Sequence, residues 1–264
     1  MRLFSYAILG LWVLAVVAGY LFQLDPNTIN LNVILQGPTT QYWFGADDLG
    51  RDILARVLSG VEMSVLVACI VTIVTMIFGV LVGMLAGFYG GRVDSVLMQV
   101  TDIFLAFPGI LLAIAFAAVL GPGLGNLILA LSLTGWVSYA RLTRGQTISL
   151  RSRQHVLAAE SLGAGVPRLL FRHILPLMTS VLVVEAAYSL ASVMIAEASL
   201  SFLGLGIQAP DASWGAMLRD AVRFMLVAPH YVLIVGACLM SLILAINLAG
   251  DYLRDKLDVK REME

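Results

Sequence analysis

Residues 61–88 read VEMSVLVACIVTIVTMIFGVLVGMLAGF, and this segment establishes the class of the protein. It holds a single charged side chain, Glu62, among apolar residues and a few small polar ones. A helix needs about 20 consecutive, mostly apolar residues to cross the hydrocarbon core of a bilayer. Because the segment exceeds that length, it is predicted to be a transmembrane helix.

The composition of the whole chain points to the same class. Of its 264 residues, 60% are hydrophobic and 12% are charged, whereas a soluble globular protein carries roughly 25% charged residues. A core of ordinary size cannot hide this much apolar surface, so lipid must solvate it. The sequence therefore predicts an all-α integral membrane protein. The net charge of −1 argues against a nucleic-acid partner.

Length and hydrophobicity predict about six transmembrane helices. The expected ranges are 3–22, 61–88, 95–119, 123–142, 177–203 and 228–250. The first range could instead be a cleaved signal peptide, but its apolar run is longer than the roughly 7–15 residues of a signal core. We therefore expect residues 1–60 to form a first helix with an outside loop, and residues 61–264 to form the main membrane domain.

The distribution of Lys and Arg predicts that both termini are cytoplasmic, because cytoplasmic loops carry the excess of basic residues. With the N-terminus inside, twelve basic residues lie inside and four lie outside. The inside set is Arg2, Arg92, Arg141, Arg144, Arg151, Arg153, Arg168, Arg172, Arg254, Lys256, Lys260 and Arg261, and the outside set is Arg51, Arg56, Arg219 and Arg223.

Residues 143–176 form the long cytoplasmic loop between the fourth and fifth ranges. Within it, residues 153–163 read RQHVLAAESLG, which favours a helix that stops at Gly163. A second helix is expected over 167–175, ended by Pro176. The predicted product is a helix–turn–helix elbow. Lipid head groups could contact it, but a short, bent helix with small side chains favours a protein partner.

A polar stripe marks the fifth range, because its small and polar residues fall on one helix face. An ionisable residue inside a span is costly and by default points to function. We therefore predict a wet face that lines a substrate pathway, with polar contacts between helices as the alternative. The stripe consists of Glu185, Tyr188, Ser189, Ser192, Ala196 and Ser199.

Two further acidic residues are candidates for the pathway. Glu197 lies on another side of the fifth range, where it could instead support the outer loop or pair with an arginine. Asp102 lies near the inner end of the third range, ahead of a kink expected at Pro108. Residues 204–227 are expected to cap the outside face, with Trp214 at the membrane interface.

Three glycines four residues apart, Gly79, Gly83 and Gly87, let another helix backbone approach the 61–88 helix closely. They predict either a contact with another subunit or packing inside the chain.

Sequence signatures of enzymes are missing. The only lysines are Lys256 and Lys260, so the chain has no G-x-x-x-x-G-K-[ST] loop for ATP. Both cysteines, Cys69 and Cys238, lie in apolar runs and suggest neither a disulfide nor a metal framework. We predict no catalytic residue, no metal site and no cofactor in this chain.

Several motifs together resemble one family of membrane transporters. The Ala158-Ala159 pair, Gly163 and the later run HILP at 173–176 resemble the EAA loop of ABC-importer permeases. Further matches are FGADDLGRD at 44–52, GGRVD at 90–94, AEASLSFLGLG at 196–206 and NLAGDYLRD at 247–255. From about residue 40 to 258 the chain resembles the dipeptide/oligopeptide/nickel permease family, specifically the second of its two paired permeases.

This resemblance implies a type I ABC-importer permease fold and an elbow that docks on a separate ATPase subunit. The coupling contact would fall on Ala158, Ala159, Glu160, Gly163 and Pro176. The implied partners are a homologous permease, forming a heterodimer, two ABC ATPase subunits that bind ATP and Mg, an extracytoplasmic solute-binding protein, and the lipid of a bacterial inner membrane.

Short peptides are the leading substrate, and nickel or a metal chelate is the alternative within the family. A self-sufficient secondary carrier or channel is the alternative from another class. Such a carrier would show inverted repeats and buried charge relays, and the sequence shows no convincing repeat. Whether Glu185, Glu197 and Asp102 line the pathway or only brace helices is left open at this point.

Overall fold

Helices account for nearly all of the regular structure. The computed structural model describes the backbone of residues 2–262 and the side chains of residues 5–257. Arg2, Lys260 and Arg261, which enter the charge count, have side chains outside this part. Within it, extended pairing is limited to one bridge between Ala46 and Asp52, which confirms the all-α prediction.

The long helices are α1 (Arg2–Leu21), α2 (Ile53–Tyr89), α3 (Gly91–Leu105), α4 (Gly109–Leu120), α5 (Leu124–Arg151), α8 (Leu175–Phe202) and α10 (Pro229–Glu262). The short ones are η1 (Leu31–Val33), α6 (Gln154–Ser161), α7 (Val166–Arg168), the π-helical η2 (Leu169–Ile174) and α9 (Trp214–Val222).

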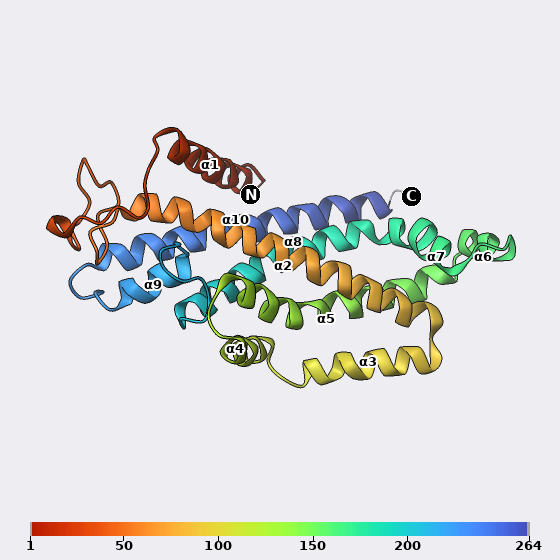
Figure 1. Cartoon of the computed structure of the whole chain (residues 1–264). Coiled ribbons are helices and arrows are strands. Elements are labelled where there is room, and N and C mark those ends of the chain that lie inside the picture. The colour runs from red at the N-terminus through yellow and green to blue at the C-terminus, as the bar shows by residue number, and fades with distance from the viewer. Residues whose placement is uncertain (1, 263–264) are drawn as a thin grey trace.

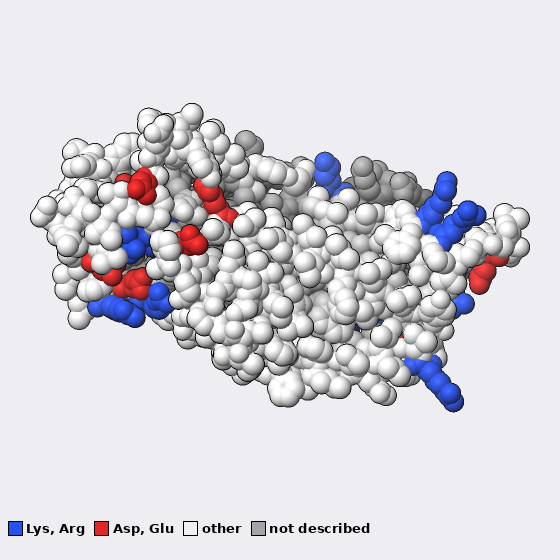
Figure 2. All heavy atoms as spheres, viewed as in Figure 1, with Lys and Arg blue, Asp and Glu red and all other residues white. Residues whose placement is uncertain are grey.

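Four of the long helices, α2, α5, α8 and α10, run along the length of the molecule (Figure 1). Helix α8 packs against α2, α5 and α10, and α2 packs along most of α5. The short helix α6 lies at one end, whereas α9 and the loop between α1 and α2 lie at the other (Figure 1). On the face shown in Figure 2, charged side chains gather toward these two ends and leave the middle mostly uncharged. This is the distribution expected of a protein whose middle lies in lipid.

The core of the described part consists of distinct clusters at different heights. One, beside α9, contains Trp214, Met217 and Tyr231, each fully buried. Another surrounds the ends of α2 and α5 that lie beside α6, and it extends to α6 through Val156. Each end of the molecule therefore has its own packed core, and the long helices connect them.

Each of the six expected ranges falls on helix, but not every one is a single apolar span. By length and composition, the described residues contain three helices able to cross a membrane, Ile53–Tyr89, Val166–Phe202 and Pro229–Leu257, and a fourth if α3 and α4 count as one. The apolar part of α1 is shorter, Ser5–Leu21. Helix α5 is not among these apolar helices, because its Ser, Thr, Gly and Asn residues lower its hydropathy. It packs against α2, α4 and α8, so much of its surface contacts protein and need not be apolar.

The third expected range, 95–119, is wrong as one continuous span. Helices α3 and α4 meet at an angle of 84°, and the break falls at residues 106–108, where Pro108 precedes α4 as its N-cap. Proline lacks the backbone N–H that would continue the ladder of α3. The kink expected at Pro108 is therefore confirmed, and it is sharper than a bend within one helix.

Pro176 does not end a helix, contrary to the sequence prediction. It occupies the first turn of α8, and α7, η2 and α8 form one helical run, Val166–Phe202. A proline ring clashes with the carbonyl four residues earlier. The wider π-helical turn of η2 directly before it accommodates that carbonyl, so the helix continues.

The three glycines of α2 serve packing inside the chain. A Cβ on Gly79 would lie 2.4 Å from the carbonyl oxygen of Trp136, and one on Gly83 would lie 2.0 Å from Oγ1 of Thr143. Both neighbours belong to α5. Of the two readings left open by the sequence, close helix packing within the chain is the one observed.

Candidate coupling elbow and translocation pathway

Helix α6 is held at one end of the molecule by a single buried side chain. Val156 is fully buried and packs with Leu150, Leu169 and Ile174. The helix begins after Arg153, which provides no side-chain cap. Ser152, whose residue type could cap the start of the helix, instead donates its hydroxyl proton to the carbonyl of Ser149. Packing by Val156, rather than capping, therefore fixes the start of the elbow.

The end of α6 has the hydrogen bonds of a helix terminated by glycine. Gly163 has φ of +84°, a conformation that L side chains rarely adopt. The amide of Ala164 donates to the carbonyl of Ala159 at 3.0 Å, and the amide of Leu162 to that of Ala158 at 3.1 Å. The turn depends on the backbone of Gly163, because open space surrounds the position of a Cβ there.

The outer face of the elbow is exposed, and it carries two leucines among polar side chains that include Gln154, His155 and Ser161. Leu162 is 88% exposed and Leu157 is 47% exposed. Ala158 and Glu160 are also exposed, whereas Ala159 is partly buried against the core beneath. The elbow thus presents two leucines and an alanine around one carboxylate, supported from behind by Val156.

Two arginines tie the base of the elbow to α2 and α3. Arg151, the last residue of α5, donates to the carbonyl of Phe88 and places its guanidinium 4.7 Å from the centre of the Phe88 ring. About two turns earlier in α5, Arg144 makes two hydrogen bonds to Asp94 of α3, at 2.5 and 2.7 Å. A displacement of the elbow would therefore move α2, α3 and α5 together.

A cavity of about 510 Å³ opens between α4, α5 and α8. Four hydroxyl side chains line it, Thr134 and Ser138 from α5 and Ser192 and Ser199 from α8. The rest of its lining is apolar or glycine, and none of its described lining residues is charged. The hydroxyl groups of the cavity can donate hydrogen bonds to a ligand or accept them from it, and the uncharged lining does not attract ions of either sign.

The expected stripe of α8 divides among its neighbours, because other helices surround α8. Tyr188 donates to Asp251 of α10 at 2.6 Å. Ser189 accepts from Thr72 of α2 at 3.5 Å. Glu185, partly buried, lies close enough to Tyr139 of α5 for an electrostatic interaction.

Of the stripe residues, the cavity brings together Ser192, Ala196 and Ser199. Sequence reasoning missed Thr134 and Ser138 on α5. Their spacing of four residues, which places both hydroxyls on one helix face, was the available signal.

The two other acidic candidates lie elsewhere. Glu197 is fully buried and accepts hydrogen bonds from Ser64 at 2.8 Å and Ser201 at 2.7 Å. It does not face the cavity, and its position fits the alternative role of supporting the outer loop. Asp102 is exposed on α3 and interacts electrostatically with Arg144.

The opposite end of the molecule is held by buried ion pairs. Asp47 is fully buried and receives a hydrogen bond from Nε of Arg51 at 2.7 Å, with Nε of Arg56 at 3.5 Å. Asp52 caps α2 by accepting from the amide of Leu54. Burial, followed by the negative charge of Asp47, raises the pKa of Asp48, and burial raises the pKa of Asp52.

Trp214 is not at the membrane interface, contrary to the sequence prediction. It is fully buried in the core cluster beside α9, and its indole donates to the carbonyl of Val57 at 3.0 Å. A tryptophan satisfied by a backbone carbonyl inside the protein has no need of the interface.

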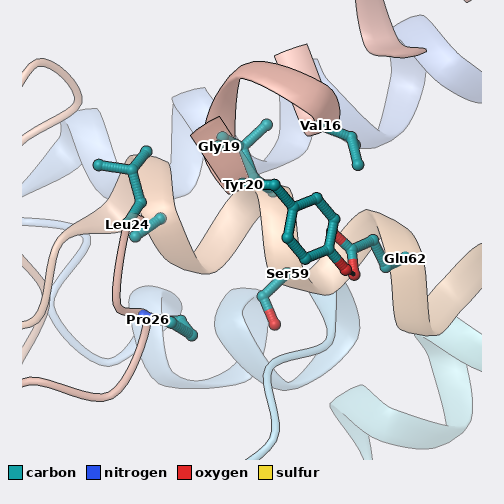
Figure 3. Close-up of a pocket in the computed structure, with 9 residues that line it drawn as sticks. Val16, Gly19, Tyr20, Leu24, Pro26, Ser59 and Glu62 are labelled. Carbon is teal, nitrogen blue, oxygen red and sulfur yellow. Dashed lines mark hydrogen bonds between the residues drawn. The ribbon is translucent and has the colours of Figure 1, made fainter. Parts of the chain in front are cut away.

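A smaller pocket of about 200 Å³ lies between α1 and α2 near this end (Figure 3). Figure 3 shows Tyr20 of α1 directed at Glu62 of α2, and its hydroxyl donates to the Glu62 carboxylate at 2.6 Å. Glu62 is exposed, unlike Glu197. The two glutamates therefore stand in opposite environments at the same end of the molecule.

The sequence of the chain matches the model of a known protein family. The chain belongs to the family described as "Binding-protein-dependent transport system inner membrane component", whose model matches residues 79–259. It is a permease subunit of an ABC importer, a multi-pass inner-membrane protein. It is not an enzyme, because ATP hydrolysis belongs to separate subunits of such systems.

Curated relatives give closer matches. A glutathione transport system permease protein, GsiD, of Escherichia coli O6:K15:H31 is 43% identical over 254 residues, which cover 96% of this chain and 82% of that protein. The GsiD protein of Pectobacterium atrosepticum is 41% identical over 257 residues, covering 95% and 85%. The sequence-based assignment to the dipeptide/oligopeptide/nickel permease family is confirmed.

The fold is similar to that of a solved transporter. A chain of the MetNI methionine ABC transporter, in an inward-facing conformation, matches with a TM-score of 0.62 at 17% identity. The match covers 76% of this chain and 95% of that one. At this identity the likeness establishes the fold, and it confirms the ABC-importer permease architecture expected from the sequence.

Proposed function

We propose that this chain forms one half of the membrane channel of a short-peptide importer and that α6 receives the force of ATP hydrolysis. By this proposal it pairs with a homologous permease and works with two ABC ATPase subunits, which bind ATP and Mg. An extracytoplasmic binding protein delivers the substrate. The observation that carries the proposal is the pair of exposed leucines on the elbow, Leu157 and Leu162, held from behind by Val156.

The chemistry of the elbow supports docking on a protein. Leu162 is 88% exposed at the tip of the molecule, where contact with water is unfavourable. Burying this leucine with Leu157 and Ala158 in a groove of an ATPase would remove that apolar surface from water. The basic residues around the loop suit the cytoplasmic side, which is where ATP is available.

The path of the substrate is proposed to run along the cavity between α4, α5 and α8. Its hydroxyls, including Ser192 and Thr134, can hydrogen-bond the amide groups of a peptide. The named relatives transport glutathione, a tripeptide, and this similarity favours a peptide over nickel as the cargo.

Both termini are proposed to be cytoplasmic. This orientation places α6 inside, together with Arg141, Arg144 and Arg151 on the second half of α5. The ion-paired loop before α2 and the helix α9 then face the outside, where a binding protein would meet them.

Co-purification of the ATPase subunits with variants of the elbow tests the proposal. Gly163→Val forces a β-branched residue into φ of +84°, which costs roughly 1–2 kcal/mol and distorts the turn after α6. We expect ATPase recruitment to fall about tenfold while the chain still inserts into the membrane.

Gly165→Ala is the matched control, because Gly165 has φ of −69° and open space at its Cβ position. It should recruit the ATPases normally. Recruitment by Gly163→Val equal to that of the unaltered chain would remove the docking role of α6.

A further inference from the structure

The buried carboxylate of Glu197 lies where α2, α8 and the segment 203–213 before α9 meet, at the end of the molecule opposite α6. It accepts hydrogen bonds from Ser64 on α2 and from Ser201 on α8 itself. Ser213, the N-cap residue of α9, lies close enough to Glu197 to interact with it. Glu197 and all three serines are buried to the point of having no exposed surface.

Two of the serines also accept hydrogen bonds from backbone amides. The hydroxyl oxygen of Ser201 accepts from the amide of Ile207 at 3.3 Å, and that of Ser213 accepts from the amide of Ala216 at 3.2 Å. A carboxylate only accepts hydrogen bonds. Ser201 must therefore direct its proton at the ionised Glu197, which leaves its lone pairs for the amide of Ile207. A Ser213 hydroxyl turned toward Glu197 would serve the amide of Ala216 in the same way.

Close packing surrounds this junction. A Cβ on Gly206 would lie 2.0 Å from Oγ of Ser201, and one on Gly215 would lie 2.2 Å from the carbonyl oxygen of Ala198. The 203–213 segment and the start of α9 are thus seated directly on the outer end of α8. A displacement of α8 at this height must move them.

A carboxyl group buried without a cation is costly in free energy, and replacing such a group by an apolar residue often stabilises a protein. None of the hydrogen bonds or ion pairs described for Glu197 involves a cation. Retention of a carboxylate at this place therefore needs a reason other than packing.

The position of Glu197 along its helix supplies that reason. The helical run Val166–Phe202 begins beside the elbow and carries Glu197 near its far end. One continuous helix thus connects the surface proposed to receive force from the ATPase with the segment proposed to face the binding protein.

We infer that Glu197 is a positioning residue that couples α8 to the outer surface. Through Ser201 and Ser213 it fixes the 203–213 segment and α9 in the geometry that a loaded binding protein recognises. The role in recognition of the binding protein rests on the proposed function and orientation, whereas the fixing of the 203–213 segment and α9 by Glu197 does not.

The first experiment measures hydrogen exchange at the amides of Ile207 and Ala216 in the purified full chain. Glu197→Gln keeps the volume but offers an NH₂ donor, which reverses one serine and releases its amide. We expect exchange at one or both of these amides to rise about tenfold or more. Unchanged exchange would overturn the inference, whatever the chain transports.

The second experiment uses the assembled complex with its binding protein in lipid vesicles. Glu197→Gln and Glu197→Ala should raise the binding-protein concentration for half-maximal ATPase stimulation, about threefold and tenfold respectively. Basal ATPase activity should stay within about twofold of the unaltered complex. A role in stability alone would instead lower basal and stimulated rates together.

Glu62 provides the matched control, because it is a glutamate near the same end, exposed and bonded only to Tyr20 among its described hydrogen bonds. Glu62→Gln and Glu62→Ala should leave both measurements unchanged. If Glu197→Ala does not fold, Ser213→Ala breaks the same relay at α9 and should give the same response.

Failure of this inference is distinguishable from failure of the proposed function. If the unaltered chain recruits no ATPase, the proposed function is wrong, and the exchange measurement still decides the role of Glu197. If ATPases assemble and both Glu197 variants respond to the binding protein normally, the coupling role is overturned while the proposed function stands.

Discussion

Hydroxyl side chains on α8 differ in what they contact, although they fall on one face of an ideal helix. Ser192 is exposed to the cavity, whereas Ser189 is partly buried and bonded to Thr72. The reason is that α8 has helices on several sides, so a face that looks continuous in the sequence meets different neighbours. Under the proposed function, residues that line the cavity between α4, α5 and α8 are the ones expected to contact a substrate.

This difference predicts unequal reactivity of cysteines placed at the two positions. In a chain with Cys69 and Cys238 replaced by alanine, Ser192→Cys should react with a small polar thiol reagent about tenfold faster than Ser189→Cys, because reaction needs an accessible thiolate. The rates can be followed by mass spectrometry of the purified protein. Equal rates at both positions would show that the cavity is not wet.

Single residues also mark the limit of what the sequence could predict. The positive φ of Gly163 follows from its place after a short helix, and the sequence identified it. The partners of Glu197 could not be found in the same way, because Ser64 and Ser213 are distant in the chain and reach it only through the packing of α2 and α9. Sequence periodicity describes one helix and carries no information about its neighbours.

At the scale of elements, the helices were largely predictable and their junctions were not. Apolar runs place the helices because lipid and backbone hydrogen bonding leave few other options. Two prolines have opposite effects on the helices that contain them. The helix breaks at residues 106–108, next to Pro108, whereas the helical run continues through Pro176 after a π-helical turn. Both have the same local chemistry, and the surrounding packing decides between a break and an adjustment.

Packing between α2 and α5 depends on glycine at one point of closest approach. A Cβ on Gly83 would lie 2.2 Å from the carbonyl oxygen of Ala140, as well as touching Thr143. We expect Gly83→Ala to lower the free energy of unfolding by about 2–3 kcal/mol, the cost of overpacking a core where backbone must move. The measurement is thermal or denaturant unfolding in detergent, followed by circular dichroism.

Gly236→Ala is the control for the same substitution in a helix. Gly236 lies in α10 with open space around its Cβ position, so alanine should stabilise by roughly 0.5–1 kcal/mol through its better helix propensity. A similar change at both positions would mean that α2 and α5 do not pack as closely as described.

At the scale of the whole molecule, two differently built ends are connected by long helices. One end has a small elbow with an exposed leucine, and the other has buried ion pairs around Asp47 and the Glu197 junction. Relaying movement between such ends requires rigid connections, which the close α2–α5 packing and the continuous Val166–Phe202 run provide. The elbow itself is joined to α2 through Arg151 and to α3 through Arg144.

The charge distribution predicts that the elbow faces the cytoplasm, and labelling in cells can test this orientation. In a chain without Cys69 and Cys238, Leu162→Cys would report on the elbow and Trp43→Cys on the loop before α2, where the native side chains are 88% and 70% exposed. With spheroplasts and a membrane-impermeant maleimide, Trp43→Cys should be labelled and Leu162→Cys should not. Inside-out vesicles should give the reverse, because the basic elbow belongs on the cytoplasmic side.

A third sample connects the orientation to the mechanism. When the ATPase subunits are expressed together with the chain, Leu162→Cys should become protected in inside-out vesicles as the leucine position enters the partner's groove, while Trp43→Cys labelling in spheroplasts stays as it was. Labelling of Leu162→Cys in intact spheroplasts would place the elbow outside the cell. No ATPase could then reach it, and neither the docking of α6 nor the transmission of force along α8 would be possible.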